Sequence, residues 1–297
     1  MSLVNSLLVL PDGNLVMKDF CGGTDTHAIT NRDTGSQLVV LEPDRLAVIA
    51  ELELPEGSIA RLTATAEPAV GAATLHVVGD QHLHTIGWDP TTRQLTERHA
   101  PRRYLTQDGQ TFGWDAVIAD GCAWFLDNGE GTATFGPSFR GKGVSISPLH
   151  LIRFDLADPA AQPTCTEVCG RPGGIIANTP LIDRVRKIAV GYDSGNGVLA
   201  AWHYPQEASA PLVPLWQRDQ HHAGHMLLDA EGGRFLTFDY DHDIGQDHAT
   251  IVDVATGDVI ERVATGSPVQ TVLFPSPGWN DDAYVVSFTT ISRISRS

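Results

Sequence analysis

The chain has 297 residues, of which 42% are hydrophobic and 19% charged, so it can bury a large core without disulfide staples. Its 36 acidic residues against 20 Lys and Arg give a net charge of −16, which excludes the basic surface that nucleic-acid binding needs. No apolar run approaches the roughly 18–20 residues of a membrane helix. The first residues also lack the features of a signal peptide. We therefore expect a cytoplasmic protein that binds neither nucleic acid nor membranes.

Hairpins are predicted along the whole chain, because short β-branched and aromatic runs alternate with turns of Gly, Pro, Asn and Asp. Six copies of one unit, two apolar strands around a polar turn, cover residues 5–19, 58–80, 114–127, 177–193, 222–239 and 269–287. Their turns are expected at Pro11–Asn14, Val70–Gly71, Asp120–Gly121, Asp183–Arg184, Glu231–Gly233 and Pro277–Gly278.

Further strands are expected between the copies, for example at 37–41 and 46–54 and again at 250–253 and 259–263. Successive copies begin roughly 45–65 residues apart, which is the spacing of four-stranded propeller blades. The prediction is one all-β domain over residues 1–297, a six-bladed β-propeller. Five blades are complete, and the sixth ends at 290–296 with at most a third strand. A pair of β-sandwiches is the competing interpretation.

In a propeller, the starts of the first strands and the ends of the second strands surround one central opening. The starts carry Asn5, Ser58 with Arg61, Trp114 with Asp115, Asn178, His222 with His225, and Gln270. The ends carry Asp19, Asp80, Asp127, Asp193, Asp239 and Ser287. Such converging polar groups suit a polar ligand or a hard metal ion. The alternative is structural, because an Asp at a strand end often caps the amides of the next loop.

The densest group of titratable residues in the sequence lies between Asp219 and His248. His222 and His225 stand where an inner strand begins, and imidazole is the natural proton carrier near pH 7. The run from Asp239 to Gly245 is similar to a calcium loop, but Ile244 occupies the position of the required glycine, which favours a solvated acidic loop. His and carboxylates together do not select one metal.

A long glycine-rich loop is predicted at 127–147. Phe139 and Arg140 in this loop are candidates to cover a substrate and to bind an anion, and a surface insertion is the alternative. Cys165 and Cys169 lie too far apart on one extended strand to form a disulfide, so both are expected to be reduced.

Three segments carry a family resemblance. Residues 177–202, with Ala189-Val-Gly-Tyr-Asp193-Ser-Gly-Asn196-Gly, resemble a blade of the SMP-30/gluconolactonase and strictosidine-synthase-like propellers. Ala223-Gly-His225 with Asp229, and Ser267-Pro-Val-Gln270, are similar to the next two blades. The resemblance covers about 120 residues and implies a central divalent cation, usually calcium, that polarises a lactone or ester carbonyl. Asn178 matches a metal-binding asparagine of the family. Ala223 replaces an acidic ligand, and the N-terminal Glu-Gly-Pro motif is absent.

These observations give one main functional hypothesis, a metal-assisted hydrolase of a small lactone or ester. Asn178, Asp127 and Asp193 are the candidate metal ligands, and Ca²⁺ is the expected metal. His222, His225 and Asp239 are the candidate catalytic residues, with His222 or Asp239 as general base. The candidate substrate-binding residues are Arg61, Trp114, Asp115, Phe139, Arg140 and Gln270. A non-catalytic ligand-binding or interaction propeller is one alternative, and a metal-free isomerase or lyase using the two histidines is another.

Overall fold

The computed structural model describes residues 2–5, 7–19, 36–56, 62–79, 81–104, 116–127, 147–176, 178–222, 224–229, 231–268, 276–277, 283–286 and 291–294. Apart from the short 3-10 helix η2 (Pro68–Val70), the regular elements in these ranges are β-strands. Within the same ranges, no helix has the length and the apolar character needed to span a membrane.

The described strands form six antiparallel sheets, and apart from β1, which joins the second sheet, the members of each sheet follow one another along the chain. The first sheet contains β2 (Leu7–Val9), β3 (Leu15–Asp19), β4 (Ser36–Leu41) and β5 (Val48–Leu54). The second contains β6 (Leu62–Glu67), β7 (Ala72–Val78), β8 (His82–Asp89) and β9 (Gln94–Glu97), with β1 (Ser2–Asn5) beside β6 and β10 (Arg102–Arg103) beside β8. The third contains β11 (Val117–Ala119), β12 (Cys122–Asp127), β13 (Pro148–Asp155) and β14 (Thr164–Pro172).

The remaining three sheets repeat this order. The fourth contains β15 (Leu181–Asp183), β16 (Ile188–Asp193), β17 (Val198–His203) and β18 (Val213–Asp219). The fifth contains β19 (Met226–Asp229), β20 (Arg234–Asp241), β21 (Gln246–Asp253) and β22 (Val259–Ala264). The described part of the last sheet has three strands, β23 (Ser276–Pro277), β24 (Ala283–Val286) and β25 (Ile291–Ile294).

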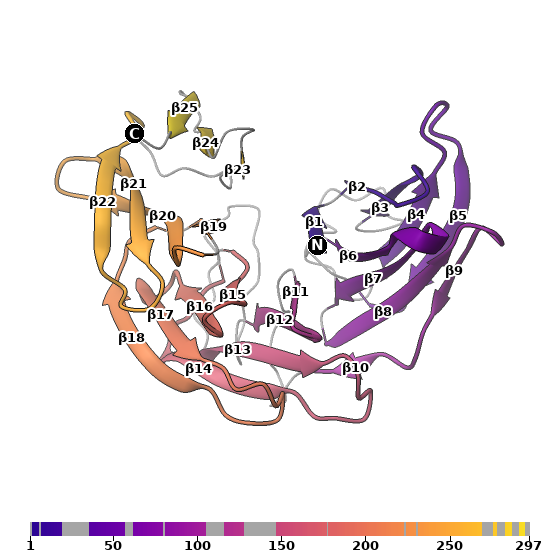
Figure 1. Cartoon of the computed structure of the whole chain (residues 1–297), viewed down its shortest axis with the longest axis horizontal. Coiled ribbons are helices and arrows are strands. Elements are labelled where there is room, and N and C mark those ends of the chain that lie inside the picture. Colours follow the sequence, from indigo (N-terminus) through magenta and orange to yellow (C-terminus); the bar gives the residue numbers. More distant parts are fainter. Residues whose placement is uncertain are drawn as a thin grey trace.

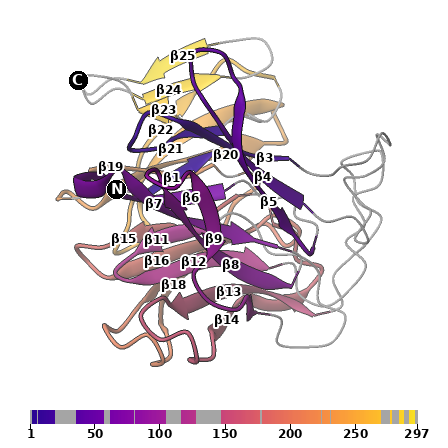
Figure 2. The same cartoon turned by 90° about the vertical axis from the view of Figure 1, so that its right-hand side faces the viewer.

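The sheets follow one another in chain order around an arc, with β2–β5 towards one end and β23–β25 at the other (Figure 1). The side view also places β23–β25 at the end of the molecule opposite β13 and β14 (Figure 2). The inner strands β6, β11, β15 and β19 contact one another in sequence. Radial antiparallel sheets whose first strands meet at the centre form a β-propeller, so the predicted all-β propeller fold is confirmed.

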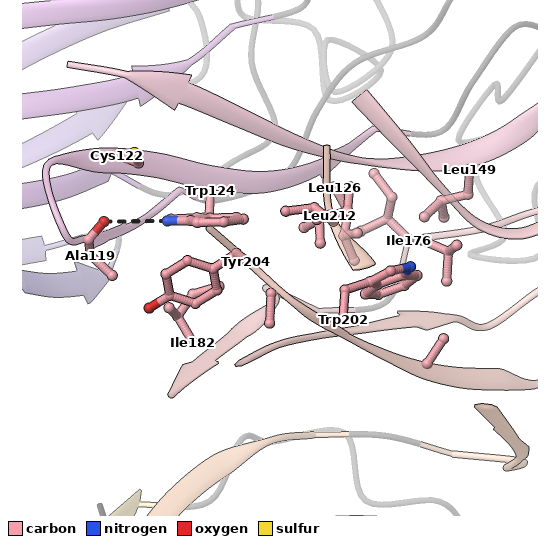
Figure 3. Packing of buried hydrophobic residues seen from close by; sticks show 14 of the residues in the cluster. Ala119, Cys122, Trp124, Leu126, Leu149, Ile176, Ile182, Trp202, Tyr204 and Leu212 are labelled. Atoms are coloured by element: carbon pink, nitrogen blue, oxygen red, sulfur yellow. Dashed lines mark hydrogen bonds between the residues drawn. The ribbon is translucent and has the colours of Figure 1, made fainter. Parts of the chain in front are cut away.

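Clusters of buried apolar side chains pack consecutive sheets against one another. Between the third and fourth sheets, Trp124 packs on Tyr204 with their ring centroids 4.9 Å apart, and the Trp124 indole donates to the Ala119 carbonyl at 3.3 Å (Figure 3). Equivalent clusters join the first and second, the second and third, and the fourth and fifth sheets. The second strands of the third and fourth sheets, β12 and β16, are buried on both faces and therefore carry apolar residues at consecutive positions.

Buried arginines reinforce two of these junctions. The Arg153 guanidinium lies 4.8 Å from the Trp124 ring and donates to the carbonyls of Pro205 at 2.9 Å and Glu207 at 3.0 Å. Arg102 lies over Phe154 and donates to backbone carbonyls in the same way. Each buried arginine therefore donates to loop carbonyls of the following sheet and ties the two sheets together.

The expected hairpins in the second to fifth copies all form around their predicted turns. At Asp120–Gly121, both residues have positive φ values of 50° and 71°, the conformation that an Asp-Gly hairpin turn requires. Two details differ from the prediction. Asn5 does not begin the first hairpin but ends β1, which pairs with β6, and Pro277 belongs to β23 rather than to the last turn.

Candidate functional site

Three of the predicted site residues lie just before neighbouring inner strands. Asn178 precedes β15, and His222 and His225 precede β19. Because β15 and β19 are in contact and occupy equivalent positions in consecutive sheets, these residues approach the same end of the propeller. The propeller repeat therefore places residues that are more than forty positions apart in the sequence at the starts of neighbouring inner strands.

His222 is held by a carboxylate that the sequence analysis did not assign to the site. Its Nδ1 atom lies 3.1 Å from Oδ1 of Asp247, which is completely buried, while 14% of the His222 side chain is exposed. The backbone around Asp247 is also fixed, since its carbonyl accepts from the amide and the hydroxyl of Thr265. With Nδ1 of His222 donating to a carboxylate oxygen, Nε2 is the ring nitrogen that is left to accept a proton.

A second polar network fixes the segment that carries both histidines. Nε2 of the buried Gln220 donates to the His222 carbonyl at 2.7 Å and to Oγ1 of Thr237 at 2.8 Å. The same hydroxyl lies 3.3 Å from Nδ1 of His225. Burial, with a smaller contribution from His222, lowers the pKa of His225 to about 3. The His225 ring is therefore neutral at pH 7, and it suits hydrogen bonding in the site better than the transport of a charge.

Asn178 is buried without any hydrogen-bond partner in the described part of the chain. Its side chain is only 1% exposed, and neither Oδ1 nor Nδ2 is bonded. Leaving both polar atoms of a buried amide unsatisfied is unfavourable by about 1–3 kcal/mol for each group. Because such groups in native proteins normally have a partner, the Asn178 side chain is a candidate to bind a ligand at this site.

The candidate metal ligand Asp193 has a structural role. Its Oδ1 atom accepts from the amides of Ile175 at 3.2 Å and Asn196 at 3.0 Å. Its Oδ2 atom accepts from the Asn196 side chain at 2.8 Å and from Sγ of Cys169 at 3.2 Å. The carboxylate thus organises the loop that leads into β15 and the turn between β16 and β17.

Asp239 repeats the role of Asp193 in the next sheet. It accepts from the amide of His221, eighteen residues earlier in the chain, which is also the separation between Asp193 and Ile175. Its other oxygen lies 3.5 Å from Arg262. Asp241 accepts from the amides of Asp243 and Ile244 in the β20–β21 turn. The acidic run that is similar to a calcium loop is therefore a hairpin closed by a local Asp–backbone turn.

Asp127 is buried against His150. One carboxylate oxygen lies 3.1 Å from the His150 amide and 3.2 Å from Nδ1 of its ring. Burial by itself would lower the pKa of His150, but the hydrogen bond and the charge of Asp127 outweigh this effect and raise it. Asp127 and His150 thus behave as a buried pair at the end of β12.

The geometry fits a divalent cation only in part. Within the described ranges, no three His, Cys, Asp or Glu side chains form a group that could hold a metal ion. The unbonded oxygen of Asn178 suits a cation ligand, whereas the oxygens of Asp127 and Asp193 already accept hydrogen bonds.

The candidate substrate-binding residues Arg61, Trp114, Asp115, Phe139, Arg140 and Gln270 lie outside the described residues. The sequence signal that could have found Asp247 is its place in the His- and Asp-rich stretch. Its pairing with His222 depends on tertiary structure, because the two residues are 25 positions apart.

No family model matches the sequence, and no curated protein matches it. Solved structures do match the fold. The periplasmic gluconolactonase PpgL of Pseudomonas aeruginosa is 14% identical over 98% of this chain and 80% of its own, with a TM-score of 0.58. A luciferin-regenerating enzyme is 14% identical over 96% and 83% of the two chains, with a TM-score of 0.51. The Dos1 propeller is 9% identical over 95% and 65%, with a TM-score of 0.54. At these identities, the chain shares the propeller fold with proteins of different function.

Proposed function

We propose that the protein is a hydrolase of a small lactone or ester, with its active site at the starts of β15 and β19. The pairing of His222 with Asp247 carries this proposal, because it joins a partly exposed imidazole to a fixed, buried carboxylate. A carboxylate on one ring nitrogen orients the imidazole and stabilises it when the other nitrogen takes a proton. The likeness of the fold to a gluconolactonase supports the choice of a lactone over other carbonyl substrates.

The reaction needs two proton transfers, one from water to His222 and one from His222 to the departing oxygen. Nε2 of His222 accepts a proton from water as the water oxygen attacks the carbonyl carbon. The bond from that carbon to the ring or ester oxygen then breaks, and His222 returns the proton to the departing oxygen. Water and lactone give a hydroxy acid, and Asp247 holds the ring in one tautomer throughout. Gln220 keeps the backbone of His222 in place through its carbonyl.

Asn178 is the residue that we assign to the carbonyl side of the reaction. Its oxygen is suited to hold a divalent cation, Ca²⁺ being the metal expected from the family resemblance, and such a cation when bound polarises the carbonyl group. Asp127 and Asp193 would assist this cation site while their carboxylates keep the hydrogen bonds described above. The amide nitrogen of Asn178 can in addition donate to a carbonyl oxygen.

A non-catalytic ligand-binding propeller is the second candidate. It is favoured by the structural hydrogen bonds of Asp193 and Asp239, which account for two of the polar residues without any chemistry. In either case, the net charge of −16 favours a small molecule over nucleic acid. A cytoplasmic location belongs to the same proposal.

The test is a hydrolysis screen of lactones and esters, with and without a chelator, together with metal analysis of the purified protein. We expect turnover of at least one lactone, a bound divalent cation, and loss of activity on chelation that is restored by Ca²⁺. Turnover without metal and without an effect of the chelator would remove the cation from the proposal. No turnover of any substrate, with or without added Ca²⁺, would favour the binding propeller.

A further inference from the structure

A polar pocket of about 520 Å³ lies between the fourth and fifth sheets. It is lined by the turn Ser194–Gly197, which joins β16 to β17, and by Arg171, Asp219, His221 and His242. The turn is held in place by the side-chain amide of Asn196, which donates to Asp193 and to the carbonyls of Arg171 and Pro172. The sequence analysis did not identify this pocket, since its side chains come from the ends of three different sheets.

The pocket has a surplus of hydrogen-bond donors. In the described ranges, the exposed Arg171 guanidinium makes no ion pair or hydrogen bond, and the amides of Gly195 and Gly197 donate to no protein group. The rings of His221 and His242 meet edge to face with their centroids 5.2 Å apart. Tyr240 contacts the His242 ring edge to face, with their centroids 5.0 Å apart.

Among the lining side chains, Asp219 is the only one that is purely an acceptor. Its carboxylate has no hydrogen bond or ion pair with the described residues. The nearby Asp239 and Asp241 both lie within ion-pair distance of Arg262, at 3.5 and 3.7 Å, which reduces their negative field. The Arg171 guanidinium therefore lies unpaired beside free backbone donors, on a molecule whose net charge is −16.

We propose that this pocket binds a small oxyanion, a carboxylate or phosphate group, through Arg171 and the backbone amides of Gly195 and Gly197 in the Ser194–Gly197 turn. Guanidinium and backbone N–H groups are the donors that oxyanions prefer, and a bidentate pair with Arg is the strongest form of this contact. His221 lines the pocket and is followed directly by His222. If the protein is a hydrolase as proposed above, the pocket receives a negatively charged group of its substrate.

The experiment compares citrate, inorganic phosphate and glycerol as probes, by calorimetric titration of the full chain. We expect saturable binding of citrate or phosphate and none of glycerol. Arg171→Gln should weaken that binding by about tenfold or more, because it removes the charged donor. Asp219→Asn should tighten it by about two- to fivefold, because it removes a nearby negative charge. Arg234→Gln, an exposed arginine on β20 outside the pocket, serves as the matched control and should change binding less than about twofold.

Equal binding of glycerol, or unchanged affinity in Arg171→Gln with a native circular dichroism spectrum, would overturn the proposal. So would absence of saturable binding of both anions. Citrate binding without phosphate binding identifies carboxylates as the ligand class, and the reverse identifies phosphates. If the anions bind but no lactone or ester is hydrolysed, the pocket stands and the proposed hydrolase does not. If lactones are hydrolysed but the anions do not bind, the pocket assignment alone is wrong.

Discussion

His76 and His225 illustrate how single side chains in this protein depend on their surroundings. Both are histidines, but burial, aided by a nearby His in each case, lowers the pKa of His76 to about 4 and that of His225 to about 3. His222, in contrast, keeps an exposed edge and a buried carboxylate partner. The three histidines therefore differ in their exposure and in their hydrogen-bond partners. These differences distinguish His222, the proposed base, from His76 and His225.

The pH dependence of stability tests the buried state of His76. The unfolded chain binds a proton at this residue as the pH falls through about 6.5, whereas the folded chain does so only near pH 4. The free energy of unfolding should therefore fall over this range, by about 3 kcal/mol in total for this residue. In His76→Gln, that part of the loss should be absent. Urea unfolding of both proteins at a series of pH values measures the difference, and parallel curves would contradict a buried neutral His76.

At the level of the strands and turns, aspartates close the hairpins in two different ways. Asp12, Asp89, Asp155, Asp183, Asp241 and Asp253 each accept an amide two residues later. Asp193 and Asp239 instead accept amides eighteen residues earlier, across the sheet. The sequence correctly predicted Asp19, Asp127 and Asp193 at the ends of second strands, whereas Asp239 lies two residues before the end of β20 and the predicted ends Asp80 and Ser287 lie outside the described residues. It left open whether they serve a metal or the backbone, because both uses need the same residue at the same place.

Replacing Asp193 tests this structural role. We expect Asp193→Ala to lower the free energy of unfolding by about 3 kcal/mol or more, because it removes the acceptor of four hydrogen bonds, two of them from backbone amides. Asp253→Ala, which removes only a local turn contact at the β21–β22 hairpin, should cost about 1 kcal/mol or less. Chemical denaturation in the presence of a chelator measures both. Equal effects of the two substitutions would show that Asp193 does not organise its loop.

At the scale of the whole molecule, the regular spacing of the hairpins was enough to predict a propeller. The apolar runs and the Asp-Gly turn at 120–121 are local features, and local features can be found in a single sequence. The pairing of β1 with β6 was not predicted, because it joins segments about sixty residues apart and neither segment carries a signal for the other. The same limit applies to the contact between His222 and Asp247. That the whole chain forms one domain stays a prediction.

The central claim is that His222, oriented by Asp247, activates water in a lactone or ester hydrolase. The most direct test measures kcat on the best lactone for the wild type, His222→Gln, Asp247→Asn and the exposed control His203→Gln. We expect His222→Gln to lower kcat by about a hundredfold or more and Asp247→Asn by about tenfold or more, with the control unchanged. Folded variants of His222 and Asp247 that retain the wild-type kcat would contradict the account.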